Sequence, residues 1–314
     1  MLAGLDAFNS TFLSDLNATQ NRITLANQQL SSGYRVNQPS DDPGAIDAIL
    51  GYQGQIDHVT QIQTNLSHAT TVANISDSAL ASANNLLNEL TSIAAQGASG
   101  TATPASRASL GQQVQGIEEQ LVALANTTFS GQYVFGGDDP TTQPYTFNWG
   151  VPGGVVRNST AGTTVALTNS DGDTLQIPGQ TAQQIFDAQN ADGSAAPGNI
   201  FQNVYALGQA LQNTSNALPA DQQASIQTAA SSLHASVAQL AQATTISGNT
   251  LSWLQQSGDA ATFKLTTLQT QLSGLRDADA AQAATDLTTA ETAMNAAIAA
   301  HGTLNIKSLF SYMG

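Results

Sequence analysis

The sequence predicts a mainly α-helical protein: an elongated antiparallel helical bundle or coiled coil formed by both ends of the chain, with a small inserted β-rich outer domain. Apolar residues recur at helical spacing through both ends of the 314 residues. Aromatic residues make up only 5% of the chain, and Ala supplies much of its apolar content. Small side chains favour closely approaching helices over one globular core.

The first helix is predicted from apolar residues spaced three, seven and seven apart: Leu13, Leu16, Ile23 and Leu30. It is expected to end near Gly33, because glycine commonly terminates helices. A polar turn at residues 40–42 follows between Pro39 and Pro43. Asp41 or Asp42 can cap the next helix.

A long second helix is predicted over residues 44–97, which contain no proline. At ~1.5 Å per residue it would reach roughly 75 to 80 Å. After a short turn, a third helix is indicated by apolar residues spaced four and three apart: Leu110, Val114, Ile117, Leu121 and Leu124. The short connection predicts that these two helices are antiparallel neighbours.

The middle of the chain, residues 128–198, is rich in Gly, Pro, Asn and Thr. Strands are predicted at residues 132–135, 155–156, 163–167 and 174–177, with a hairpin turn at 169–173. Helical patterns return after residue 198 and continue to the C-terminus. We therefore expect a terminal helical domain (1–40 with 280–314), a second helical bundle (41–128 with 199–279) and a β-rich outer domain (129–198).

Composition disfavours several classes of function. Seven Lys and Arg face 22 Asp and Glu, a formal charge of −15, so nucleic acid and anionic membranes are not expected partners. No apolar run is long enough to predict membrane insertion. The first 13 residues lack the basic and apolar regions of a cleavable signal peptide, so export would need another route. The absence of cysteine removes disulfides and thiol chemistry.

No constellation of residues predicts an enzyme, a cofactor site or a metal site. Four histidines, His58, His68, His234 and His301, are scattered along the chain without ligand spacing. The segment 171–173 has the acidic start of a calcium loop but lacks the later ligands, which favours a hairpin turn. Glu118 and Glu119 are expected to be solvated positions on a helix.

Four segments resemble the bacterial flagellin family. They are residues 30–45 (LSSGYRVNQPSDDPGA), 124–137 (LANTTFSGQYVFGG), 184–187 with 199–201 (QIFD and NIF), and 308–313 (SLFSYM). The first is similar to the family's N-terminal signature of a helix end followed by paired aspartates. Its Pro-Ser-Asp-Asp-Pro order, together with the second segment, is more similar to the members that join hook to filament.

The resemblance implies a non-enzymatic structural component that forms a ring of identical subunits. It also implies hook-associated protein 1 and flagellin as neighbours, a cytoplasmic export chaperone, and an extracellular location reached through the flagellar type III channel. Two alternatives stay open. The chain could be a short flagellin that forms the filament itself, or a secreted coiled-coil adhesin or effector.

The resemblance further implies that the terminal helices fold against neighbouring subunits on assembly. Candidate apolar interface residues are Leu13, Leu16, Ile23, Leu30, Leu287, Met294, Ile298, Leu304 and Ile306. A purely intrachain bundle is the alternative. Arg35, Asp41 and Asp42 are candidates for polar contacts between subunits, and helix capping is the alternative for them. Tyr133 and Phe135 are expected to pack at a domain joint.

Overall fold

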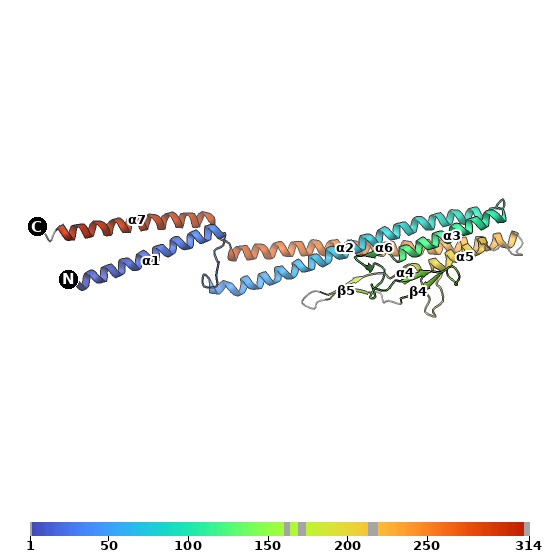
Figure 1. Ribbon diagram of the computed structural model, residues 1–314, viewed down its shortest axis with the longest axis horizontal. Coiled ribbons are helices and arrows are strands. Elements are labelled where there is room, and N and C mark those ends of the chain that lie inside the picture. Colours follow the sequence, from blue (N-terminus) through green and yellow to red (C-terminus); the bar gives the residue numbers. More distant parts are fainter. Residues whose placement is uncertain (1, 160–163, 169–173, 213–218, 311–314) are drawn as a thin grey trace. The chain divides into compact units, whose positions relative to one another are not determined.

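The computed structural model describes residues 2–159, 164–168, 174–212 and 219–310. These residues form seven helices and three two-stranded antiparallel sheets (Figure 1). The mainly α-helical fold predicted from the sequence is confirmed. The chain divides into two compact units, residues 1–60 with 263–314 and residues 61–262.

The first unit contains the terminal helices, α1 (Leu2–Ser32) and α7 (Ala280–Phe310). They lie side by side and run antiparallel (Figure 1). At one end the rings of Phe12 and His301 stack with centroids 4.1 Å apart. At the other end the Ala278 backbone N–H donates to the Gly33 carbonyl at 2.9 Å. The N- and C-terminal segments therefore meet, as the helical patterns predicted.

The first unit also holds the start of α2 (Pro43–Gly97) and the end of α6 (Pro219–Arg276). Their shared apolar cluster is built from Val36, Ala45, Ile49 and Leu272, with Tyr52 and Leu275 packed against it. α2 begins with proline, whose missing N–H costs nothing in the first turn. Its start and its end agree with the prediction from the sequence to within one residue.

The main core lies in the second unit, where α2, α3 (Pro104–Ala125), α5 (Ile200–Gln212) and α6 meet. The leucines Leu87, Leu121, Leu207 and Leu233, one from each helix, are fully buried. The stripe predicted on the third helix is confirmed, since Leu110, Val114, Ile117 and Leu121 are buried and Leu124 is half-buried.

α3 and α5 approach closely because glycine stands at the contact on each helix. A Cβ on Gly111 would come within 2.5 Å of the Gln212 side chain. A Cβ on Gly208 would come within 2.4 Å of the Trp149 ring. A larger residue at Gly111 would therefore push α5 away from α3, whereas one at Gly208 would displace the Trp149 ring.

Three hairpins and the short helix α4 (Ala182–Phe186) make up the β-rich part of the second unit. β1 (Thr128–Phe129) pairs with β2 (Gln132–Tyr133) through the turn residues Ser130 and Gly131, both with positive φ, as a tight two-residue hairpin requires. β3 (Tyr145–Phe147) pairs with β4 (Val155–Arg157), and β5 (Thr164–Thr168) with β6 (Thr174–Pro178). The strands predicted at residues 155–156, 164–167 and 174–177 are confirmed, whereas the one predicted over 132–135 ends at Tyr133. β1 and β3 were not predicted, and residue 163 and the turn at 169–173 lie outside the described residues.

Candidate functional site

The candidate assembly surface lies on α1 and α7. Among the described side chains of α1, Ala26 is the one that is buried. Leu16 and Ile23 are half-buried, whereas Leu13 is 56% exposed and Leu30 is also exposed. The pairing of the two terminal helices thus covers only part of the predicted apolar stripe.

The same holds on α7, where small residues face the partner helix. Ala283 and Ala290 are buried, Leu287 and Met294 are half-buried, and Ile298 is exposed. The side chains of Leu304 and Ile306 lie outside the described residues. Apolar surface that one chain leaves in water can be buried by another copy or another protein.

The joint between the helices is a second candidate site, formed by residues 33–42 and 275–279. Gly33 ends α1 with φ +76°, and its N–H donates to the Gln29 carbonyl at 2.9 Å. The backbone N–H groups of Arg35 and Val36 both donate to the Arg276 carbonyl. The break between α1 and α2 is therefore held directly against the break between α6 and α7.

Arg35 and Asp42 form an ion pair within this joint. Arg35 Nη1 lies 3.0 Å from Asp42 Oδ2, and its Nη2 donates to the Leu275 carbonyl at 2.6 Å. Asp42 also caps α2, because its Oδ1 accepts from the Ala45 N–H. The hydrogen bond from Arg35 lowers the pKa of Asp42 below its ordinary value.

Asp41 shapes the turn that precedes α2. Its carboxylate accepts the backbone N–H groups of Asn37 and Gln38, each at 2.9 Å. The hydrogen bond from Gln38, followed by that from Asn37, lowers the pKa of Asp41. The described contacts of Arg35, Asp41 and Asp42 within the chain are thus capping and turn contacts, and a contact between subunits stays a prediction.

Sequence reasoning missed a further contact in the joint. The Arg276 guanidinium carbon lies 4.0 Å from the centroid of the Tyr34 ring, a cation–π geometry. Tyr34 and Asp277 also form an isolated antiparallel bridge. The two residues are separated by more than 240 positions, so no local pattern could have paired them.

A polar cluster fastens the β-rich part of the second unit around Asp187. Its carboxylate accepts from the Tyr145 hydroxyl at 3.0 Å and from Asn199 Nδ2 at 2.7 Å, and it pairs with Arg157. Burial, followed by the charge of Asp187, raises the pKa of Tyr145. This cluster ties β3, β4 and the residues before α5 together. Phe135 is buried edge-on against Phe186, which gives it a packing role, while its expected place at a domain joint stays a prediction.

Glu118 corrects an expectation from the sequence. It was expected to be solvated, but its side chain is fully buried on α3, and neither carboxyl oxygen hydrogen-bonds to a described residue. The backbone of Gly154 lies directly against it, since a Cβ there would fall 2.0 Å from Glu118 Oε1. Burial raises the pKa of Glu118 to about 9, so the carboxyl group is neutral at physiological pH.

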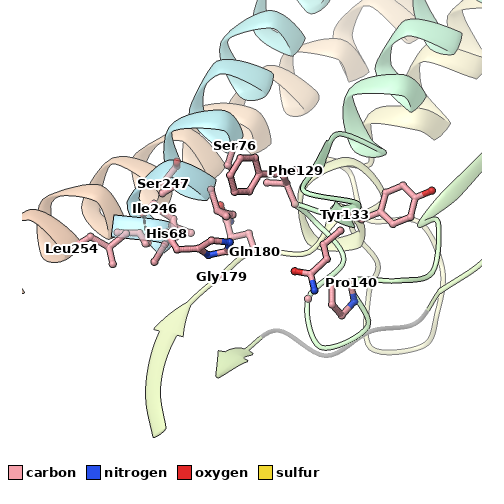
Figure 2. A pocket seen from close by; sticks show the side chains of 17 residues that line it. His68, Ser76, Phe129, Tyr133, Pro140, Gly179, Gln180, Ile246, Ser247 and Leu254 are labelled. Atoms are coloured by element: carbon pink, nitrogen blue, oxygen red, sulfur yellow. Dashed lines mark hydrogen bonds between the residues drawn. The ribbon is translucent and has the colours of Figure 1, made fainter. Parts of the chain in front are cut away.

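An apolar cavity of about 190 Å³, here called the helix pocket, lies in the second unit. Its walls come from α2, α6, the β1–β2 hairpin and residues 179–180. In Figure 2, Ser247 and Leu254 line it from α6, and Phe129 and Pro140 stand on the side of the hairpin. Small residues such as Ala69 and Ala73 leave this space between the helices. Tyr133, expected at a domain joint, also lines the pocket.

His68 is the histidine of the helix pocket. It is exposed on α2, and its ring lies 5.5 Å from that of Phe129. His234 is exposed and His58 is half-buried, while His301 stacks on Phe12.

No group of three His, Cys, Asp or Glu side chains suited to a metal ion occurs among the residues with described placement. Within the same residues, no helix combines the length and apolar character needed to cross a membrane.

The fold and its surfaces define a helical-bundle protein with a partly exposed apolar stripe on each terminal helix and a small β-rich part. Residues 7–139 match the family model described as the bacterial flagellin N-terminal helical region. The resemblance to the bacterial flagellin family that the sequence indicated is thereby confirmed.

Particular relatives match parts of the chain. Flagellar hook-associated protein 3 of Escherichia coli (strain K12) is 31% identical over 182 residues, which cover 55% of this chain and 55% of that protein. B-type flagellin of Pseudomonas aeruginosa is 29% identical over 129 residues, 41% of this chain and 26% of that protein. The chain thus spans about half the length of its hook-associated relative.

A solved structure shows the same fold over most of the chain. Flagellar hook-associated protein-3 of Legionella pneumophila superposes with a TM-score of 0.59, covering 72% of this chain and 98% of that one. The sequence identity is 16%. The likeness therefore shows a shared fold.

Proposed function

We propose that this chain is a structural subunit of the bacterial flagellum that joins the hook to the filament, as a ring of identical copies. The observation that carries the proposal is the apolar surface left exposed along α1 and α7, at Leu13 and Ile298 among others. A protein that acts alone gains nothing from such a surface, whereas a subunit buries it on assembly.

The match to hook-associated protein 3 supports the junction over the filament. It extends over 182 residues and 55% of both chains, whereas the flagellin match extends over 129 residues and 26% of that flagellin. In the junction role the neighbours are hook-associated protein 1 and flagellin. The subunit lies outside the cell, reaches its place through the flagellar export channel, and is guarded by a chaperone before export.

Three parts of the chain have different roles in this function. The terminal segments 1–40 and 280–314 form the assembly core, with identical copies beside them in the ring and with hook-associated protein 1 and flagellin on its two faces. Residues 41–128 with 199–279 form the helical bundle that transmits load, and residues 129–198 form the outer domain. The role is mechanical and requires no catalytic group, cofactor or metal.

The test is to grow filaments on isolated hook ends that carry hook-associated protein 1. Purified flagellin is added with and without prior addition of this chain, and filament-bearing hooks are counted by electron microscopy. We expect filaments on hooks that received the chain and few on hooks that did not. Equal filament growth in both samples would overturn the junction role.

Two charge variants separate assembly from folding. Leu13→Asp places a charge in the exposed apolar stripe and is expected to abolish addition to hooks. Thr11→Asp places the same charge on an exposed polar position of the same helix and is expected to leave addition intact. Equal behaviour of the two variants would show that the stripe is not the assembly surface.

A further inference from the structure

The helix pocket can accept an aromatic ring. A dry cavity of about 150 Å³ is large enough to bind benzene in another protein, and the helix pocket measures about 190 Å³. Its deeper wall is apolar, with Ala69 and Leu254 buried there. Such a site favours a flat apolar group over a charged or strongly hydrated one.

The chain itself displays a candidate ring at Phe263. This residue of α6 is 76% exposed, more than any other large apolar side chain among those described. It stands outside the seam through which α6 packs, because Leu268 and Leu272 are buried on that seam while Phe263 is not. A phenyl ring held in water is unfavourable unless a partner covers it.

Phe263 belongs to the first unit, whereas the helix pocket lies in the second. It follows Leu254, a pocket residue, by nine positions on one continuous helix. Nine residues are about two and a half turns, so the two side chains point to opposite sides of α6. A ring at one place on a subunit and a pocket at another can join identical subunits through a head-to-tail contact.

Charge supports the same pairing. Lys264 follows Phe263 directly and is the sole Lys or Arg between Arg157 and Arg276. The pocket residues Gly137 and Pro140 flank the acidic pair Asp138 and Asp139. The hydrogen bond from Thr142 lowers the pKa of Asp139, so this carboxylate is ionised at neutral pH. Insertion of the Phe263 ring would therefore bring the positive charge of Lys264 close to the negative charge of Asp139 beside the pocket.

We propose that Phe263 of one copy inserts into the helix pocket of a neighbouring copy, with Lys264 placed near Asp139 of that copy. The contact is heterologous, because it joins two different surfaces of the subunit. Repeated around a closed ring, it gives every subunit the same pair of contacts with its two neighbours. The inference deepens the proposed function and rests on it, since the assembly must bring copies into lateral contact.

The test uses the absence of cysteine from the natural chain. One preparation of the full chain carries Phe263→Cys and another carries Ser247→Cys, which places a thiol in the pocket. The two are mixed, added to hook ends and mildly oxidised. Cross-linked dimers are measured on a non-reducing gel and located by mass spectrometry. Incorporation into the assembly is measured in parallel by electron microscopy.

The matched control replaces Ser247→Cys with Gln256→Cys. Gln256 is exposed, and it follows Ser247 by nine residues, so it lies on the opposite side of the same helix. We expect the mixture with Ser247→Cys to cross-link about ten-fold faster or more, because docking raises the effective concentration of the two thiols. The product should join residues 263 and 247.

Each other outcome overturns a different claim. Assembly without the 263–247 cross-link, or with equal cross-linking to residue 256, would overturn the contact and leave the junction role standing. Failure of the unsubstituted chain to add to hooks would reject the proposed function, and the contact with it.

Discussion

The guanidinium of Arg276 stacks on the ring of Tyr34 at 4.0 Å from its centroid, and this contact joins the two places where the long helices break. Both breaks are also held by backbone hydrogen bonds from residues 35, 36 and 278. The joint therefore has a defined geometry rather than acting as a free hinge. In the proposed assembly it would fix the direction of α1 and α7 relative to the start of α2 and the end of α6 within the first unit.

Replacing Tyr34→Ala is expected to loosen this joint without unfolding the protein. A cation–π pair at a partly exposed site contributes about 0.5–1 kcal/mol, so the change in the free energy of unfolding should be of that size. Hydrogen exchange at residues 33–42 should accelerate. Arg22→Ala removes an exposed cation from α1 and serves as the control. Equal exchange in both variants would contradict a structural role for the ring.

Acidification is expected to open the same joint before the core of the second unit unfolds. The pKa values of Asp41 and Asp42 are both lowered, chiefly by hydrogen bonds from Gln38 and from Arg35 respectively. Groups with lowered pKa stabilise the folded state above their ordinary pKa of 3.8, and this contribution disappears as the pH falls through the lowered values. Hydrogen exchange at residues 33–45 should rise below pH 4, and Asp41→Asn should show a smaller rise.

Glu118 predicts the opposite dependence on pH. Its folded pKa is about 9, against an ordinary value of 4.5, so the folded state keeps a proton that the unfolded state has released between these values. The free energy of unfolding should therefore fall as the pH rises, by on the order of 1.4 kcal/mol for each pH unit in that window.

Glu118→Gln is expected to remove this slope and to stabilise the protein above pH 7. Denaturant unfolding at pH 5, 7 and 9 measures both effects. Glu119→Gln, at the exposed neighbouring position, should keep the slope of the natural chain. An unchanged slope in Glu118→Gln would mean that the carboxyl group reaches water.

Gly154 and Glu118 should be coupled energetically. Gly154 has φ +68°, and an added Cβ would overlap the Glu118 carboxyl group. Gly154→Ala should therefore cost more than the about 1–2 kcal/mol of the backbone conformation alone. In combination with Glu118→Ala the overlap disappears, and a double-mutant cycle of denaturant unfolding should report the difference.

Gly116→Ala supplies the control for that cycle. Gly116 lies in the interior of α3, and an added Cβ would meet nothing within 4 Å. This substitution should stabilise the protein by about 0.5–1 kcal/mol. Additive effects of Gly154→Ala and Glu118→Ala would contradict the contact between the two residues.

The helices were predictable because local signals set their limits. Gly33 and Pro43 end α1 and begin α2, and the four–three spacing along α3 matches its buried face. The same spacing already placed Glu118 on that face, four residues after Val114 and three before Leu121. A solvated carboxylate was expected because glutamate is usually exposed, although the position of Glu118 on the apolar face indicated burial.

The joint and the helix pocket were beyond local patterns. Tyr34 meets Arg276, and the pocket brings Ala69 to Leu254. Only tertiary packing sets such pairs. The exposure of Phe263 was likewise invisible, because an aromatic residue in a helical sequence is more often part of a core.

The most direct measurement of the central claim is electron microscopy of isolated hooks after incubation with this chain alone. A junction subunit should form a short added layer at the distal end of each hook that stops growing when the ring is complete, and Leu13→Asp should form no such layer. Long filaments grown from this chain alone would make it a filament subunit. Bare hook ends would contradict its assembly on the flagellum altogether.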